Sequence, residues 1–488
     1  MRKFSIFLQN ATFFSTLSAH IWFGIVLLSS IGIGFLSGLG YGLLILELGA
    51  LLFIGILIFF RPELGVLLYI FSIITIFNVT ALPTIKVPGL GTVYVTDMIL
   101  VYILIVVFFR DPQLKWIHSP LTIPILIYWS VRTFTVMYSA FLLGDMHAFV
   151  VQFGRNELPL LTFFPLLAIA RQRKAWGDFL RYLFIGGIGT MLFYFYSAIT
   201  RNQALLSSPL FWIRPDVNVS LGEVPRIVAL GQSIIYPLFL FGVAIEISNA
   251  GKKVKLESLL LIIICSISIV IHGFRSYWYA TIAALFVVIL ISMKGDRYAF
   301  VKIGKILTTV TIVSFLMVVL INYSPSLLAS GPFHSVWERA VSPFSHSLDL
   351  SLSYRFEELQ WAVSIIFEHP ILGWGVSFPT NPLSIRLGYA WKLVNSGYLD
   401  LLIYYGFVGL LALFYVVITY WFYAWKRLDL SSDVFQRSLL VAFMGYTVLL
   451  LINAVSSPTF VEAAEVILLN VGFVQMISLK ERKSVGYE

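Results

Sequence analysis

The chain has 488 residues, of which 59% are hydrophobic and only 12% are charged. So little charge over this length excludes a soluble globular protein. The net charge of +9 fits the loops of a membrane protein better than nucleic-acid binding, and the single cysteine, Cys265, excludes an internal disulfide and a cysteine metal cluster.

The apolar residues form runs of about 17–25 residues, which is the length that crosses a bilayer as a helix. No cleavable signal is expected at Met1–His20, because a full-length span follows it and no small-residue cleavage site is present. We predict an all-α, polytopic bundle of about 14 spans. They cover residues 21–39, 41–60, 65–81, 96–109, 119–141, 157–170, 179–199, 227–248, 256–272, 275–293, 303–322, 396–424, 437–457 and 461–479.

Lysine and arginine collect in every second loop of this arrangement. The even number of spans places both termini, and 22 of the 33 basic residues, on one side. Positive charge marks the cytoplasmic side of a membrane protein. We therefore expect one integral membrane domain over residues 1–488, with both termini in the cytoplasm.

Two loops on the opposite side are long. They cover residues 200–225 and 323–394, and loops of such length are usually functional. Within the second loop, Phe356, Leu359, Ala362, Val363 and Ile366 recur at helical spacing. This pattern predicts an amphipathic helix over 354–369, which lies either on the outer membrane surface or over the mouth of a cavity.

Arginine is unusually frequent on the non-cytoplasmic side. A guanidinium group has the planar geometry that binds phosphate or carboxylate, so these residues indicate an anionic ligand. Each also has a simpler explanation. Arg355 can pair with Glu358, Arg275 can reach lipid phosphate beside the interfacial aromatics that follow it, and Arg226 can anchor the eighth span. The set comprises Arg155, Arg201, Arg214, Arg226, Arg275, Arg339, Arg355 and Arg386.

Arg132 differs from these residues because it falls near the middle of the fifth span. A charge at that depth is costly and usually faces the interior of the bundle. Pairing with an intramembrane carboxylate, such as Glu157, Glu462 or Glu465, is as consistent with the sequence as contact with a substrate.

The second half of the chain resembles a known family. The run from Arg355 to Trp361, the sequence His369-Pro370-Ile371-Leu372-Gly373-Trp374-Gly375, and Asn395-Ser396-Gly397-Tyr398-Leu399 are similar to the C-terminal signature of the O-antigen polymerase and O-antigen ligase superfamily. Arg226 and Arg275 also lie where this family places arginines. The resemblance covers residues from about 220 to 410.

This resemblance implies a glycosyltransferase that takes its donor from undecaprenyl diphosphate. Arg226, Arg275 and Arg355 would bind the diphosphate and stabilise the charge of the leaving group. Arg155, Asn395 and Tyr398 would support the site. The candidate bases are Glu357 and Glu358, with Asp349 as a further acid in the same loop. No divalent-metal motif and no cofactor motif is found, so we expect a metal-independent transferase.

Many family members, ligases especially, have histidine directly before the asparagine of the last motif, where this chain has Val394. That difference favours a polymerase of lipid-linked repeat units over a ligase. A transporter or flippase of an anionic lipid-linked glycan is the third possibility, although it would place more arginines in mid-membrane. The expected partners are the undecaprenyl-diphosphate-linked oligosaccharide, membrane lipids, and flippase and chain-length regulator proteins, with no nucleic acid.

Overall fold

The computed structural model describes residues 52–73, 84–87, 91–110, 118–144, 146–200, 211–214, 226–229, 232–248, 251–271, 275–293, 301, 304, 308, 350–379, 381–382, 394–429, 433–460 and 463–479. By their contacts the residues divide into two units, Met1–Arg61 and Pro62–Glu488. In the first unit, residues 52–60 are helical. The predicted spans 21–39 and 303–322 and most of 41–60 lie outside the described residues, as does most of the loop 323–394 before residue 350. All that follows concerns the second unit.

The first half of this unit contains α5 (Pro62–Phe71), α6 (Val95–Arg110), α7 (Thr122–Leu143), α8 (Met146–Gln152), α9 (Phe163–Ala170) and α10 (Arg173–Thr200). Between α8 and α9 the chain forms a π-helical turn, η4 (Phe153–Glu157), and a 3-10 turn, η5 (Leu158–Thr162). The second half contains α12 (Gln232–Ile247), α13 (Lys252–Ile271), α14 (Arg275–Met293), α18 (Leu350–Glu368), η8 (Gly375–Ser377), α20 (Gly397–Leu428), α21 (Val434–Asn453) and α22 (Ala463–Ser478).

The unit is therefore mostly helical, as the sequence predicts. Four of the described helices are long and apolar enough to cross a membrane, in the ranges Thr122–Leu142, Ser276–Met293, Gly397–Leu428 and Val434–Asn453. This is an integral membrane protein. The full predicted count includes residues outside the described ranges and stays a prediction.

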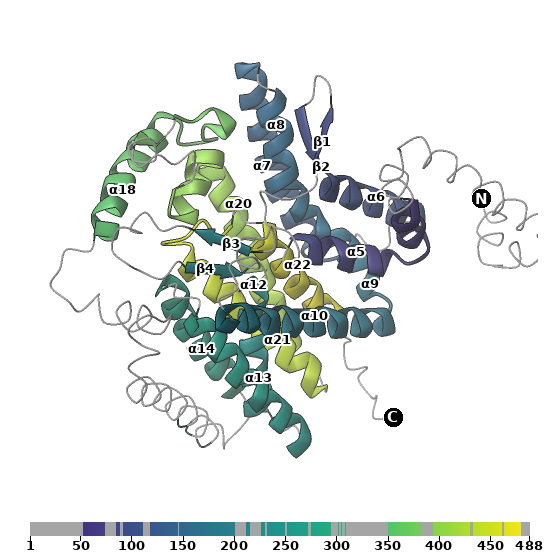
Figure 1. Ribbon diagram of the computed structural model, residues 1–488. Helices are drawn as coiled ribbons and strands as arrows, with labels where there is room; N and C mark the ends of the chain where they lie inside the picture. Colours follow the sequence, from purple (N-terminus) through teal and green to yellow (C-terminus); the bar gives the residue numbers. More distant parts are fainter. Residues whose placement is uncertain are drawn as a thin grey trace, which may run out of the picture. The chain divides into compact units, whose positions relative to one another are not determined.

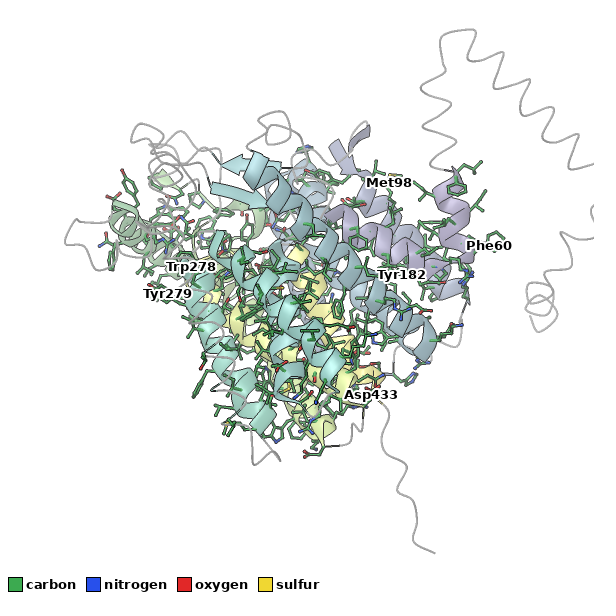
Figure 2. All side chains as sticks on the ribbon, turned by 60° about the horizontal axis from the view of Figure 1, so that its bottom comes forward. Phe60, Met98, Tyr182, Trp278, Tyr279 and Asp433 are labelled. Carbon is green, nitrogen blue, oxygen red and sulfur yellow. The ribbon has the colours of Figure 1, made fainter. Side chains whose placement is uncertain are left out.

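The helices pack in two groups that can be followed in Figure 1. α12, α14 and α21 lie against one another, with α13 on α12, whereas α7 lies along α20 and α22 lies along α9. About two thirds of the α21 span is buried inside the protein (67%), but only 33% of the α14 span is. Thus α21 is central and α14 is peripheral. Many large side chains on the outside of the helices are apolar, including Met98, Tyr182 and Tyr279 (Figure 2), as expected where a helix faces lipid.

Two short antiparallel hairpins modify the predicted all-α class. β1 (Thr84–Val87) pairs with β2 (Gly91–Tyr94), and β3 (Phe211–Arg214) pairs with β4 (Arg226–Ala229). The predicted eighth span therefore begins as a strand, and α12 starts only at Gln232. A four-residue strand is too short for an alternating pattern to distinguish it from the end of an apolar span.

The predicted span 157–170 is not one continuous α-helix. Pro159 lacks an N–H group, and the chain around it forms the 3-10 turn η5. Backbone carbonyls in this turn accept hydrogen bonds from Asn470 of α22, whose Nδ2 lies 3.1 Å from Leu160 O and 3.4 Å from Pro159 O. A side chain from a distant helix thus satisfies carbonyls that would otherwise be exposed to an apolar environment.

Candidate active site

Arg132, in the middle of α7, pairs with Glu157 of η4. Both side chains are completely buried, and Nε of Arg132 lies 2.8 Å from Oε2 of Glu157. Of the two alternatives for Arg132, pairing with Glu157 is confirmed. Glu465 instead accepts a hydrogen bond from Tyr277, and Glu462 lies outside the described residues.

The rest of the Arg132 guanidinium is also hydrogen-bonded. Nη1 donates to the Tyr128 hydroxyl at 2.8 Å, and Nη2 donates to the Tyr405 hydroxyl at 3.1 Å. The Tyr405 hydroxyl donates in turn to Glu157 Oε1 at 2.6 Å. Two backbone carbonyls complete the network, those of Asn156 and Phe460. A buried ion pair is tolerated only when such additional bonds are made, so Arg132 acts as a cross-link between α7, η4, α20 and the segment before α22.

Arg155 lies two residues before Glu157 but is exposed, because the π-turn η4 directs the two side chains to different sides. Its Cζ atom lies 5.8 Å from the ring centre of Tyr94, and its charge acts on Asp97 and Tyr404. A Cβ atom at Gly154 would lie 2.1 Å from Oδ2 of Asp97 on α6, so a larger residue there would displace this buried carboxylate. Turns of this kind are frequent at functional sites.

A helix lies where the amphipathic helix is predicted, namely α18, Leu350–Glu368. Its packed side is not the predicted stripe, however. Glu358, Ala362, Ile365 and Ile366 are buried, whereas most of the predicted apolar positions are exposed. Arg355 and Glu357 are exposed on the same helix.

Glu358 connects α18 to the motif that precedes α20. Its Oε2 accepts hydrogen bonds from the backbone N and the Nδ2 of Asn395, both at 3.1 Å, and its Oε1 accepts one from Nδ2 of Asn381 at 3.2 Å. Burial raises the pKa of the Glu358 carboxyl, and the hydrogen bonds from Asn395, the charge of Arg355 and the bond from Asn381 oppose that shift. A raised pKa suits a general base, but the bonds to both oxygens are typical of a residue that positions other groups.

The motif from His369 to Gly375 forms a turn that docks into a break in α20. Gly406 interrupts α20 with φ 63° and ψ −167°, and the freed N–H groups of Phe407 and Val408 donate to Pro370 O at 2.8 Å and to Ile371 O at 3.2 Å. In the opposite direction, Trp374 N donates to Ile403 O at 2.7 Å. The motif is thus explained by backbone packing.

The two glycines of this turn have positive φ and no room for a side chain. At Gly373 a Cβ atom would lie 2.7 Å from Ile403 O, and at Gly375 it would lie 2.0 Å from Oγ of Ser139 on α7. The same Ser139 hydroxyl accepts a hydrogen bond from Val376 N at 2.9 Å. The turn therefore fixes α18 against both α20 and α7.

The Asn395–Leu399 motif is also tied to its surroundings. Ser396 caps α20, Gly397 N donates to Ala454 O and Ser457 O at 2.8 Å each, and the Tyr398 hydroxyl donates to Leu451 O at 2.7 Å. Asn395 and Tyr398, predicted to support a substrate site, thus lie in a structural joint between α18, α20 and α21.

Arg226 and Arg275 each lie at the start of an element. Arg226 opens β4 directly opposite Arg214 of β3, and Arg275 is the first residue of α14. The helices that follow are joined by Tyr236 of α12 and Tyr277 of α14, whose stacked rings are 4.7 Å apart. The common site for Arg226, Arg275 and Arg355 stays a prediction, as do the catalytic roles of Glu357 and Glu358. Asp349 lies outside the described residues.

A comparison with protein families bears on this arrangement. Residues 260–414 match the family model described as O-Antigen ligase. The chain carries an O-antigen ligase family domain. The match confirms the resemblance to the O-antigen ligase and polymerase superfamily, and it includes α14, α18, the docking turn and the first half of α20. The protein is therefore a membrane enzyme of the O-antigen ligase and polymerase type. No curated protein matches the chain.

Sequence reasoning missed the residues that build this framework. Asn381 is a partner of Glu358, Tyr405 completes the Arg132 network, and Gly406 breaks α20. Gly406 left a weak signal, since glycine within a long apolar span often marks a backbone irregularity. Asn381 and Tyr405 left none, because their roles depend on contacts between distant parts of the chain.

Proposed function

We propose that this enzyme polymerises undecaprenyl-diphosphate-linked oligosaccharide repeat units on the outer side of the bacterial inner membrane. The observation that carries the proposal is the placement of two arginines within the O-antigen ligase domain: Arg275 begins α14, and Arg355 is exposed on α18. In the predicted arrangement of 14 spans with cytoplasmic termini, both face the outer side.

In the proposed reaction, an acceptor hydroxyl attacks the anomeric carbon of the lipid-linked glycan. The bond between that carbon and the diphosphate breaks, the hydroxyl proton passes to a carboxylate, and undecaprenyl diphosphate leaves with the bonding electrons. Guanidinium groups of Arg226, Arg275 and Arg355 would stabilise the charge that develops on the diphosphate. Arg214, which pairs with Arg226 in the hairpin, would add a second positive charge beside it.

A ligase that transfers the finished glycan to another acceptor is the second candidate, because the matching family is described by that activity. Val394 favours polymerisation. It stands where many ligases have histidine, it is buried, and its N–H donates to Oδ1 of Asp400 at 2.9 Å. In a strain that lacks the protein, a polymerase defect leaves single repeat units on the normal acceptor, whereas a ligase defect leaves long chains on the lipid carrier.

Arg275→Lys and Arg355→Lys are each expected to abolish most of the long glycan chains while the protein still accumulates in the membrane. Lysine keeps the charge but loses the planar pair of donors that holds a diphosphate in register. If these arginines only reach lipid phosphate, lysine replaces them well. Glycan length in the deletion strain with each variant at matched protein level distinguishes the two roles. Wild-type profiles for both variants would overturn the diphosphate assignment.

Glu357→Gln and Glu358→Gln should separate the base from the positioning residue. In Glu358→Gln an amide NH2 replaces one oxygen and meets the donors of Asn395 or Asn381, so we expect a loss of about 1–3 kcal/mol in the free energy of unfolding. Glu357 is exposed, and Glu357→Gln should leave the melting temperature unchanged while glycan chains shorten. If Glu357→Gln keeps wild-type chain length, Glu357 is not the base.

The undecaprenyl-linked oligosaccharide is the proposed substrate. Flippase and chain-length regulator proteins are proposed partners, because the proposed reaction needs repeat units on the outer side and a control of the length of its product.

A further inference from the structure

Helix α18 has three distinct faces. The first is packed against the protein and contains Glu358, Ala362, Ile365 and Ile366. A second face is apolar but exposed: Phe356 is 60% exposed, Leu359 41%, Val363 39% and Phe367 74%. Polar residues form the third, namely Glu357, Gln360, Ser364 and Glu368, all of them exposed. Because residues at i, i+3 and i+7 lie on one side of a helix, the four exposed apolar residues form a continuous stripe, which we call the α18 stripe.

The α18 stripe continues into the lipid-facing side of α20. After Phe367, the docking turn exposes Ile371 (66%), whose carbonyl accepts from Val408 N, and the neighbouring Pro370 carbonyl accepts from Phe407 N. Phe407 is itself 48% exposed. From there the exposed apolar residues repeat at helical spacing down this membrane-spanning helix, in the order Phe407, Leu411, Tyr415, Ile418 and Phe422.

We propose that the α18 stripe is inserted in the outer leaflet of the membrane, so that α18 is an interfacial helix. A helix with one strongly polar face and one apolar face lies in the plane of the interface, with its apolar side a few ångströms below the lipid headgroups. The exposed apolar side of α20 would face lipid where this helix spans the membrane. The acidic and amide residues of the polar face would then lie in water, where charged groups are well solvated.

Insertion at this depth would place Arg355 at the level of lipid phosphates. Arg355 is on the same helix, one residue before Phe356. The diphosphate of a polyprenyl-linked glycan lies at that level because its lipid tail is in the leaflet. The match between Arg355 and the diphosphate rests on the proposed function. The insertion of the α18 stripe in the membrane does not.

The position of α18 can be measured on the purified protein in vesicles of phosphatidylethanolamine and phosphatidylglycerol, without substrate. Single cysteines for spin labels would replace Leu359, Val363 and Phe367 on the stripe and Gln360, Ser364 and Glu368 on the polar face. The background is Cys265→Ala, since Cys265 is buried in α13. Collision with oxygen, which concentrates in lipid, is compared with collision with a nickel chelate, which stays in water.

We expect the ratio of oxygen to nickel accessibility to be several-fold higher at the three stripe positions than at the three polar positions. Labels at 359 and 367 should have the same depth, because a helix in the membrane plane keeps its ends level. An upright helix would separate them by about 12 Å. Nickel accessibility at 363 and 367 equal to that at 364 would place the stripe in water and overturn the proposal. Low accessibility to both probes would mean that protein covers the stripe, and would overturn it as well.

A matched pair of variants provides a second measurement. In Val363→Asp a charge enters the stripe, whereas in Ser364→Asp the same charge enters the polar face one residue later. In native membranes we expect Val363→Asp to increase cleavage of the α18 segment by protease added from the outer side several-fold, and Ser364→Asp to leave it unchanged. Equal cleavage of the two variants would contradict insertion. Because neither measurement uses glycan synthesis, failure of the proposed function would leave both results interpretable.

Discussion

Glu157→Ala is expected to prevent the protein from accumulating in a folded form. The substitution leaves the guanidinium of Arg132 completely buried without its carboxylate partner, and the Tyr405 hydroxyl loses its acceptor at 2.6 Å. Removal of one member of a buried ion pair costs about 3–5 kcal/mol. That is a large part of the roughly 5–15 kcal/mol by which a typical protein is stable. We expect little protein in the membrane and a strongly lowered melting temperature in detergent.

Two further variants make this expectation specific. Arg155→Ala removes an exposed cation only two residues from Glu157. It should change the free energy of unfolding by no more than about 1 kcal/mol, as for other exposed charges. Arg132→Met combined with Glu157→Gln removes both charges. It should recover part of the loss, because no unpaired charge stays buried, although Tyr128 loses a donor. Wild-type accumulation and melting of Glu157→Ala would show that the pair is not needed for folding.

The buried ion pair, helix α18 and the membrane class were predictable because each depends on residues that are close together in the sequence. A charge in the middle of an apolar span must be paired, so Arg132 indicated a buried partner, and Glu157 was among the candidates. The helical spacing of apolar residues and the stop at Pro370 located α18 to within a few residues. The apolar runs indicated a membrane protein, and the basic residues in alternate loops predicted its orientation.

What the sequence did not reveal depends on which distant segments meet. Phe356, Leu359, Ala362, Val363 and Ile366 were predicted to form one apolar face, yet the structure packs Ala362 and Ile366 and exposes the other three. The difference arises because Glu358 is bound by Asn395 and Asn381, which rotates the helix so that a carboxylate lies on the packed side. A buried carboxylate is rare without partners, and those partners were unknown from the local pattern.

Signature motifs presented a related difficulty. Asn395 was predicted to support the substrate site, and the glycines of the His369–Gly375 motif belong to the same family resemblance. In the structure they connect α18 to α20 and α7 through backbone contacts. Residues of a family signature can be required for catalysis or for the packing of the fold. The positions of Arg226, Arg275 and Arg355 are therefore better candidates for chemistry than the glycines between them.

Gly406→Ala is expected to release α18 and its docking turn from α20 and to abolish glycan synthesis. With φ 63° and ψ −167°, Gly406 occupies a backbone region that is nearly closed to other residues, which costs about 1–3 kcal/mol for alanine. In addition, a Cβ atom would lie 2.2 Å from the carbonyl oxygen of Ile371. Since that atom belongs to the backbone, the turn must move.

Movement of the turn would break the hydrogen bonds from Phe407 N to Pro370 O and from Val408 N to Ile371 O. We expect Gly373→Ala, on the other side of the same contact, to have the same effect, because its Cβ atom would lie 2.7 Å from Gly406 N. Gly189→Ala in α10 is the control. Nothing lies within 4 Å of a Cβ atom there, so alanine should be tolerated.

The measurement is protease cleavage within the α18 segment from the outer side of intact membranes, together with glycan length in the deletion strain. Gly406→Ala and Gly373→Ala should be cleaved rapidly and produce no long chains, whereas Gly189→Ala should match the wild type in both. Because each variant keeps all of its arginines and carboxylates, a loss of synthesis would show that the docked position of α18, and with it the position of Arg355, is required for the reaction. If Gly406→Ala is cleaved rapidly but still makes long chains, the docked turn is a structural feature without a part in catalysis, and Arg355 does not belong to the diphosphate site.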